Sequence, residues 1–116
     1  MDTETKKCYE QIKKILKNVE NTKLEINDNL IKNVAFMTVT LNKLQKEINE
    51  KGVIEKFEQG KQNFLRESPA LKSYNATFKN YTSAIKQLNE LVPEDKKQQA
   101  GEDLLKFIAS DATWTT

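Results

Sequence analysis

The chain has 116 residues and a formal net charge of +2, with 37% hydrophobic and 31% charged residues, which predicts one soluble domain. It contains a single cysteine, Cys8, and no histidine, so an internal disulfide is excluded and a structural zinc site is not expected. The longest strictly apolar run extends only from Val34 to Met37, so we expect no membrane span, no signal peptide and a cytoplasmic protein.

The lack of histidine also bears on catalysis. Histidine is the usual general base at neutral pH and completes most Ser-His and Cys-His nucleophile arrangements. The carboxylates that remain form no recognisable pair in an apolar setting. We therefore expect a protein that is not an enzyme and needs no cofactor, and we look for its function in binding and assembly.

A first helix is expected over residues 3–19. Its apolar stripe consists of Tyr9, Ile12, Leu16 and Val19, with Cys8 and Ile15 beside it. The helix also carries a group of lysines that are candidates for phosphate contact: Lys6, Lys7, Lys13, Lys14 and Lys17.

Residues 20–28 are expected to form a polar break before a second helix over residues 28–51. Asn27 or Asp28 suits the N-cap, because a side-chain oxygen there can accept from the free amides of the first turn. The pair Thr22 and Glu25 matches a capping box, so an earlier start remains open.

The second helix has one apolar seam and a clear end. Gly52 follows Lys51, at the position where a left-handed backbone is least costly for glycine. The seam residues are Leu30, Val34, Met37, Leu41, Leu44 and Ile48.

Residues 53–66 interrupt the helical pattern. The segment is long for a helix–helix turn, and Val53, Ile54, Phe57, Phe64 and Leu65 make it too apolar for a disordered linker. A short β-hairpin or an extended flap that covers the helices fits this pattern, and a structureless loop is the alternative.

A third helix is expected over residues 69–92. Ser68 offers an N-cap oxygen, Pro69 suits the first helical position, and Pro93 disfavours helix at Val92. We expect an all-α fold in which this helix and the second form an antiparallel hairpin. The regular period of its seam also predicts coiled-coil-like association between subunits, with a self-sufficient monomer as the alternative. The residues expected at the oligomer contact are Leu71, Tyr74, Phe78, Tyr81, Ile85 and Leu88.

Three lysines lie seven residues apart on the third helix. Lys72, Lys79 and Lys86 therefore share one face, which is either a solvated surface or a track for phosphates. A helix-turn-helix made from the first two helices is weakly supported, because the break between them is longer than that motif uses.

The last part of the chain, residues 94–116, is acidic where the preceding part is basic. We expect residues 1–93 to form the main domain and residues 94–116 a flexible tail. Trp114 near the end has no periodic neighbours. The apolar residues of the tail either fold back on the core or form a helix that binds a partner: Leu104, Leu105, Phe107 and Ile108.

An ordered series of short motifs resembles the small subunit of phage terminases, the DNA-packaging proteins of tailed phages. It runs through Glu50-Lys51-Gly52-Val53, Phe57-Glu58-Gln59-Gly60-Lys61-Gln62-Asn63, Glu67-Ser68-Pro69-Ala70-Leu71, Tyr74-Asn75, Asn80-Tyr81 and Lys86-Gln87-Leu88-Asn89-Glu90-Leu91-Val92-Pro93. The likeness covers about forty residues well, roughly those from Gly52 to Pro93. The lysine-rich first helix departs from the pattern.

The resemblance implies a subunit without catalytic residues that assembles into a ring. It implies binding to double-stranded viral DNA in the host cell cytoplasm and recruitment of the large terminase subunit, which holds the ATPase and nuclease activities. The lysines of the first and third helices would then contact DNA, and the apolar tail segment would bind the large subunit. The alternative is a small helical adaptor between proteins, with no role on nucleic acid.

Overall fold

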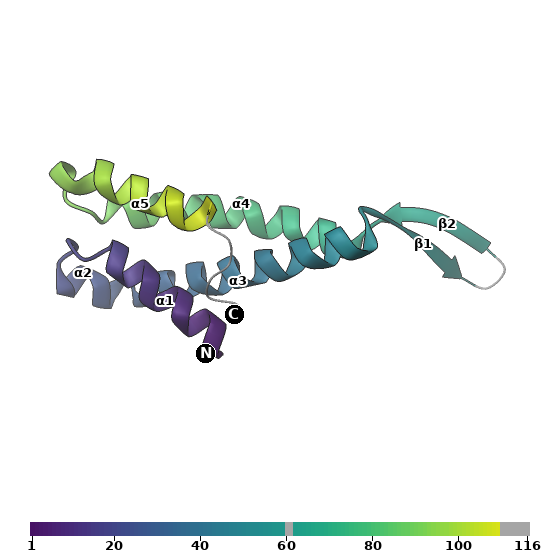
Figure 1. Cartoon of the computed structure of the whole chain (residues 1–116), viewed down its shortest axis with the longest axis horizontal. Helices are drawn as coiled ribbons and strands as arrows, with labels where there is room; N and C mark the ends of the chain where they lie inside the picture. Colours follow the sequence, from purple (N-terminus) through teal and green to yellow (C-terminus); the bar gives the residue numbers. More distant parts are fainter. Residues whose placement is uncertain (60–61, 110–116) are drawn as a thin grey trace.

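The computed structural model describes residues 1–59 and 62–109 and is mostly helical, as the sequence predicts (Figure 1). Its elongated shape, 61 × 26 × 23 Å, is set by two long antiparallel helices, α3 (Asp28–Lys51) and α4 (Pro69–Glu90). The predicted helical hairpin is confirmed, because α3 and α4 lie side by side along their length and share a row of apolar contacts.

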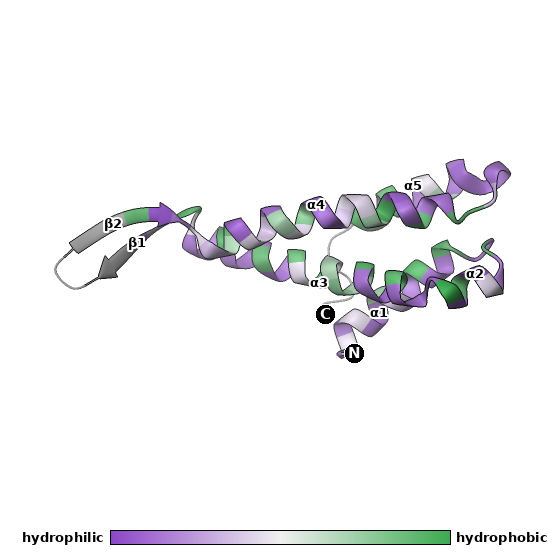
Figure 2. Ribbon diagram, turned by 180° about the vertical axis from the view of Figure 1, so that it is seen from behind, coloured by the Kyte–Doolittle hydropathy of each residue, from purple (hydrophilic) through white to green (hydrophobic). Residues whose placement is uncertain are grey.

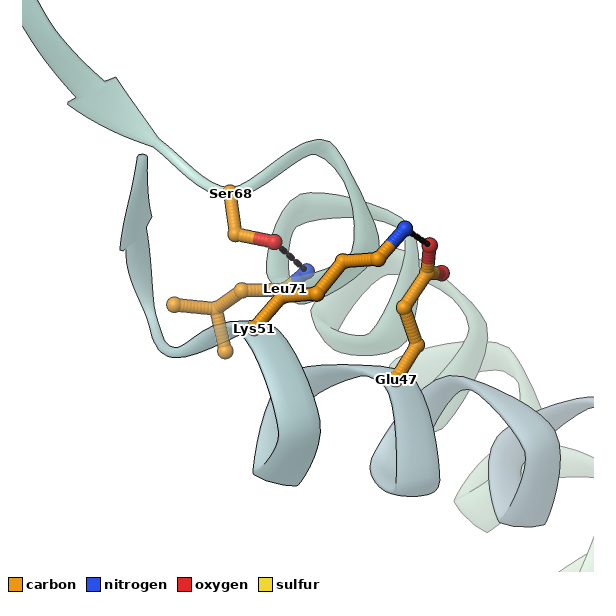
Figure 3. A network of polar contacts seen from close by, with 4 residues as sticks. All are labelled: Glu47, Lys51, Ser68 and Leu71. Carbon is orange, nitrogen blue, oxygen red and sulfur yellow. Dashed lines mark hydrogen bonds and ion pairs between the residues drawn. The ribbon is translucent and has the colours of Figure 1, made fainter. Parts of the chain in front are cut away.

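The connection between α3 and α4 is held at both helix ends. The Gly52 amide donates to the Ile48 carbonyl oxygen at 2.7 Å, and Gly52 has φ +86° with an extended ψ of 170°. This differs from the left-handed helical conformation we expected, and only glycine adopts it readily. Ser68 Oγ accepts from the Leu71 amide at 3.4 Å, which confirms the N-cap, and Lys51 forms an ion pair with Glu47 at 3.0 Å nearby (Figure 3).

The segment between these ends is a β-hairpin. Strand β1 (Ile54–Gln59) pairs antiparallel with β2 (Gln62–Glu67), in a register that runs from Ile54 opposite Glu67 to Gln59 opposite Gln62. The hairpin is one of the alternatives that the sequence left open. It extends away from the ends of α3 and α4 (Figure 1), so the expectation of a flap that covers the helices is wrong. Its base is closed by the Ser68 amide, which donates to the Val53 carbonyl oxygen at 2.8 Å.

The first helix is shorter than the sequence suggests. Helix α1 (Thr3–Ile15) begins with the Asp2 carboxylate accepting from the Thr5 amide at 2.8 Å, and it ends four residues before the predicted Val19. Leu16 and Val19 are nevertheless buried, because the chain turns there and both side chains point into the core. The sequence has no glycine or proline where α1 ends. The apolar stripe continues through Leu16 and Val19, and for this reason we predicted too long a helix.

The predicted polar break contains a short helix, α2 (Asn21–Ile26), which leads directly into α3. Helix α3 starts at Asp28 as predicted, but neither capping arrangement that we considered is present. The Asn27 side chain donates to the Lys23 carbonyl oxygen at 2.9 Å, because Asn27 has a near-helical backbone that turns its side chain back onto α2. Asp28 instead accepts from the Tyr9 hydroxyl and pairs with Lys32 at 2.9 Å, which ties α1 to the start of α3.

The acidic end of the chain is ordered as far as the structure describes it. A 3-10 turn η1 (Glu94–Lys96) leads into α5 (Lys97–Ala109), which packs back against α4 and α1. Ala100, Leu104 and Phe107 are buried there. The expectation of a flexible tether is therefore wrong for residues 94–109, and folding back on the core is the alternative that holds. Trp114 lies outside the described residues.

The buried core of the described residues lies at one end of the molecule. There α1, α2 and α5 lie beside α3 and α4 (Figure 2). We call this end the body: α1, α2, residues 28–41 of α3, residues 81–90 of α4, and α5. Residues 42–51 and 69–80 form a two-helix stem between the body and the β-hairpin. Among the described residues from 42 to 80, only Ser68 and Ala70 are buried. None of the described helices is long and apolar enough to cross a membrane.

Candidate functional site

The body contains a groove between α4 and α5. It has a volume of about 390 Å³ and a mainly apolar lining. Its principal side chains are Ile85, Lys86 and Asn89 of α4 and Leu104, Leu105 and Ile108 of α5. The sequence had assigned Ile85 to oligomerisation, Lys86 to DNA contact, and Leu104, Leu105 and Ile108 to the large subunit. The structure joins parts of these three sets in a single surface.

Helix α5 has apolar residues on two adjoining faces. One face packs on the body, and the other lines the groove. Leu104 and Phe107 point inward and are buried, whereas Leu105 and Ile108 are 67% and 42% exposed. The inward residues stabilise the body and are not available to a partner. Of the residues predicted to bind the large subunit, only Leu105 and Ile108 therefore present a surface.

A polar atom without a partner lies in the same groove. The Asn89 Oδ1 atom is shielded from water and accepts no hydrogen bond from the described chain. Buried polar groups normally have a partner, and an unmade bond costs about 1–3 kcal/mol. Gly101 of α5 faces this atom, and a Cβ at that position would lie 4.0 Å from it. A side chain at Gly101 would therefore meet this atom at an ordinary contact distance.

The residues predicted for the oligomer contact fall into three groups by burial. Tyr81 and Leu88 are buried within the subunit, so their prediction as contacts between subunits is wrong for this conformation. Phe78 is 45% exposed, and its ring stacks on that of Tyr74 with centroids 6.0 Å apart. The half-buried members of the set are Leu71, Tyr74 and Ile85.

All lysines proposed for DNA contact have exposed side chains. Lys6, Lys7, Lys13 and Lys14 belong to α1, Lys17 lies in the turn after it, and the second group, Lys72, Lys79 and Lys86, belongs to α4. Helix α1 lies beside α3 (Figure 1), so the two groups occupy different elements. Lys13 lies over the Tyr9 ring, 5.4 Å from its centroid, which fixes part of that lysine beside α3. Lys86 borders the apolar groove, a setting that spacing alone did not reveal.

Tyr81 belongs to a buried polar contact that joins α4 to α3. Its hydroxyl is 2.9 Å from Thr38 Oγ1, which also donates to the Val34 carbonyl oxygen at 2.8 Å. Because Thr38 has one hydroxyl proton, Tyr81 is the donor in the first bond. Burial raises the pKa of Tyr81 above its ordinary value, and burial raises the pKa of the Cys8 thiol from 9.0 to about 12. Cys8 is therefore protonated at neutral pH and has the character of a core residue.

Sequence analysis missed an exposed aromatic side chain on α3. Phe36 lies off the seam, is 59% exposed, and lines a depression of about 610 Å³ with Met1, Thr5 and Lys32. The signal was present, because Phe36 falls opposite Val34 and Thr38 on a helical projection. The described chain contains no group of three or more His, Cys, Asp or Glu side chains that could hold a metal ion.

Comparison with protein-family models, with curated proteins and with solved structures found no match for this chain.

Proposed function

We propose that this protein is a small terminase subunit. It binds double-stranded viral DNA as a ring-shaped oligomer and recruits the large subunit that performs the chemistry of genome packaging. In this role the chain itself is not an enzyme and uses no cofactor.

The observation that carries the proposal is the hairpin-bearing stem, which is also where the resemblance to small terminases rests. A two-stranded hairpin is marginally stable alone in water and normally needs further strands or a packed face. Here Val53, Ile54 and Leu65 are all more than half exposed, and the stem beneath them has almost no buried side chains. Contact between subunits would cover these surfaces.

Neutralisation of phosphates by lysines supports the DNA-binding part of the proposal. Each phosphate contact releases counterions and makes the affinity depend steeply on salt. One subunit carries few such lysines, but a ring repeats them around a closed surface. The lysines of α1 are the better candidates, since they lie away from the apolar groove that Lys86 borders.

The two properties are tested together on the full-length protein. We expect light scattering to give several times the subunit mass of 13.4 kDa and duplex DNA to be retained at low salt. The change Lys13→Glu with Lys14→Glu and Lys17→Glu should abolish retention and leave the particle mass unchanged. A concentration-independent monomer, or DNA retention that ignores these substitutions, would contradict the proposal.

The alternative is a helical adaptor without a nucleic-acid role, and the groove between α4 and α5 favours it. Such a protein would bind a partner through the groove and show no retention of duplex DNA at low salt. DNA retention therefore separates the two functions.

A further inference from the structure

We propose that the groove between α4 and α5 binds an acidic amphipathic helix of a partner protein. The inference rests on the proposed function, in which that partner is the large terminase subunit. It also gives Lys86 a role different from DNA contact: Lys86 recognises the acidic side of the bound helix.

The size of the groove suits one helix. Helix α5 has 13 residues and is therefore about 20 Å long, which matches three to four turns of a bound helix. Helices that lie in apolar grooves insert residues at positions i, i+3 or i+4, and i+7. Leu105 and Ile108 on one wall and Ile85 on the other provide the complementary surface.

The exposed apolar residues of α5 are not explained by the subunit's own core. Ala100, Leu104 and Phe107 already form the face that packs on the body. Leu105 is 67% exposed and Ile108 42% exposed, so both leave apolar surface in contact with water. Covering such surface contributes about 25 cal/mol per Å², so a second helix laid along α5 gains from it.

Asn89 adds a polar group to the mainly apolar lining of the groove. Its Oδ1 atom is shielded from water and has no donor within the described chain, so the side chain has to turn toward the groove to accept a hydrogen bond from the bound helix. Binding sites of this kind are mostly apolar and contain a few placed polar groups that fix orientation.

The charged residues at the rim of the groove indicate which charge the bound helix carries. Lys86 lines the groove on α4, and Lys79 lies one heptad earlier on the same face. On α5, Lys97 is paired with Glu94 at 2.9 Å, so its charge is already offset, and Glu102 stands on the outer rim. On α4, Glu90 lies one turn beyond Lys86, so Lys79, Lys86 and Glu90 together leave one net positive charge on that side. A helix with Asp or Glu along that flank is complementary to it.

The test uses two fluorescent peptides of about four helical turns. Both have the same leucine face, and one has glutamates on its flank where the other has lysines. We expect fluorescence anisotropy with the full-length protein to show binding of the acidic peptide about tenfold or more tighter than the basic one. Equal affinities would overturn the proposal, because the rim would then exert no selection.

Substitutions locate the site. Lys86→Glu should weaken the acidic peptide about tenfold, whereas Lys72→Glu makes the same charge change about 21 Å along α4 and should leave binding unaltered. Leu105→Ala should weaken both peptides, whereas Ile26→Ala, at an exposed position of α2, should not. If Lys86→Glu and Lys72→Glu acted alike, the groove would not be the site.

Other occupants give different results, each of which overturns the proposal. If duplex DNA displaced the acidic peptide, the rim lysines would serve nucleic acid. If Leu105→Ala reduced the oligomer mass, a second copy would cover the groove. If removal of residues 110–116 raised peptide affinity, the chain's own end would occupy it. DNA retention and oligomer mass are measured on the same variants, so a failed peptide result with both intact leaves the proposed function standing.

Discussion

The body and the stem are built from the same two helices, yet they differ in how their apolar seams are covered. In the body, α1 and α5 pack beside α3 and α4, and the core residues lie between positions 8–41 and 81–107. In the stem, α3 and α4 pack mainly on each other, with an ion pair of 3.8 Å between Lys43 and Glu4 of α1. The seam residues of the stem are half-exposed: Leu44, Ile48, Leu71 and Tyr74. The seams of α3 and α4 are therefore covered within the subunit at the body and only partly covered at the stem.

The largest effect is expected from removing the hairpin. Replacement of residues 53–67 by Gly-Asn gives a short connection of the kind that joins antiparallel helices. Because the core lies in the body, we expect the variant to fold but to lose its oligomeric state completely. Circular dichroism and light scattering measure the two properties. A variant that is still oligomeric would show that the hairpin is not needed for assembly.

Shortening one buried side chain in the body and one exposed side chain in the hairpin should change the free energy of unfolding by different amounts. Leu88 has no exposed surface, so Leu88→Ala should lower the free energy of unfolding by about 2–5 kcal/mol. The matched change Leu65→Ala, at a residue that is 72% exposed in the hairpin, should cost about 0.5 kcal/mol or less in a dilute, monomeric sample. Urea unfolding with an unchanged m-value measures both. Similar losses would mean that the hairpin is as well packed as the body.

A smaller effect is expected at the polar contact between α3 and α4. Tyr81→Phe removes one hydrogen bond, while Thr38 keeps its bond to the Val34 carbonyl, so the loss should be about 1 kcal/mol. A double-mutant cycle with Thr38→Val isolates the coupling of the two hydroxyls in urea unfolding. Additive losses would indicate that the two hydroxyls do not interact.

The same contrast explains how far the sequence could be interpreted. Periodicity identified both long helices, and Ser68-Pro69 identified the start of α4, because these signals are local. Phe78 and Leu88 have equivalent positions in the apolar seam of α4, yet only Leu88 is buried. Periodicity identifies the apolar face of a helix, but it does not show which other segment covers that face. The end of α1 and the packing of α5 depend on contacts between distant segments. For the same reason the groove could not be predicted: its two walls are separated by the turn from Leu91 to Lys96.

The smallest expected effect concerns Cys8, where α1 meets α3, and it tests how well the body excludes water. Burial raises the pKa of this thiol from 9.0 to about 12. Between these values the unfolded chain loses the thiol proton and the folded chain keeps it, so the stability present below pH 9 decreases as pH rises toward 12. Urea midpoints measured from neutral pH upward should fall more steeply for the natural protein than for Cys8→Ala. Tyr9, whose hydrogen bond to Asp28 raises its pKa to about 12, contributes equally to both curves. Tyr81 does not, because its pKa is raised by burial and also by the charge of Cys8. The difference between the curves therefore reports the thiol together with its coupling to Tyr81, and parallel curves would mean that Cys8 ionises as readily in the folded body as in the unfolded chain.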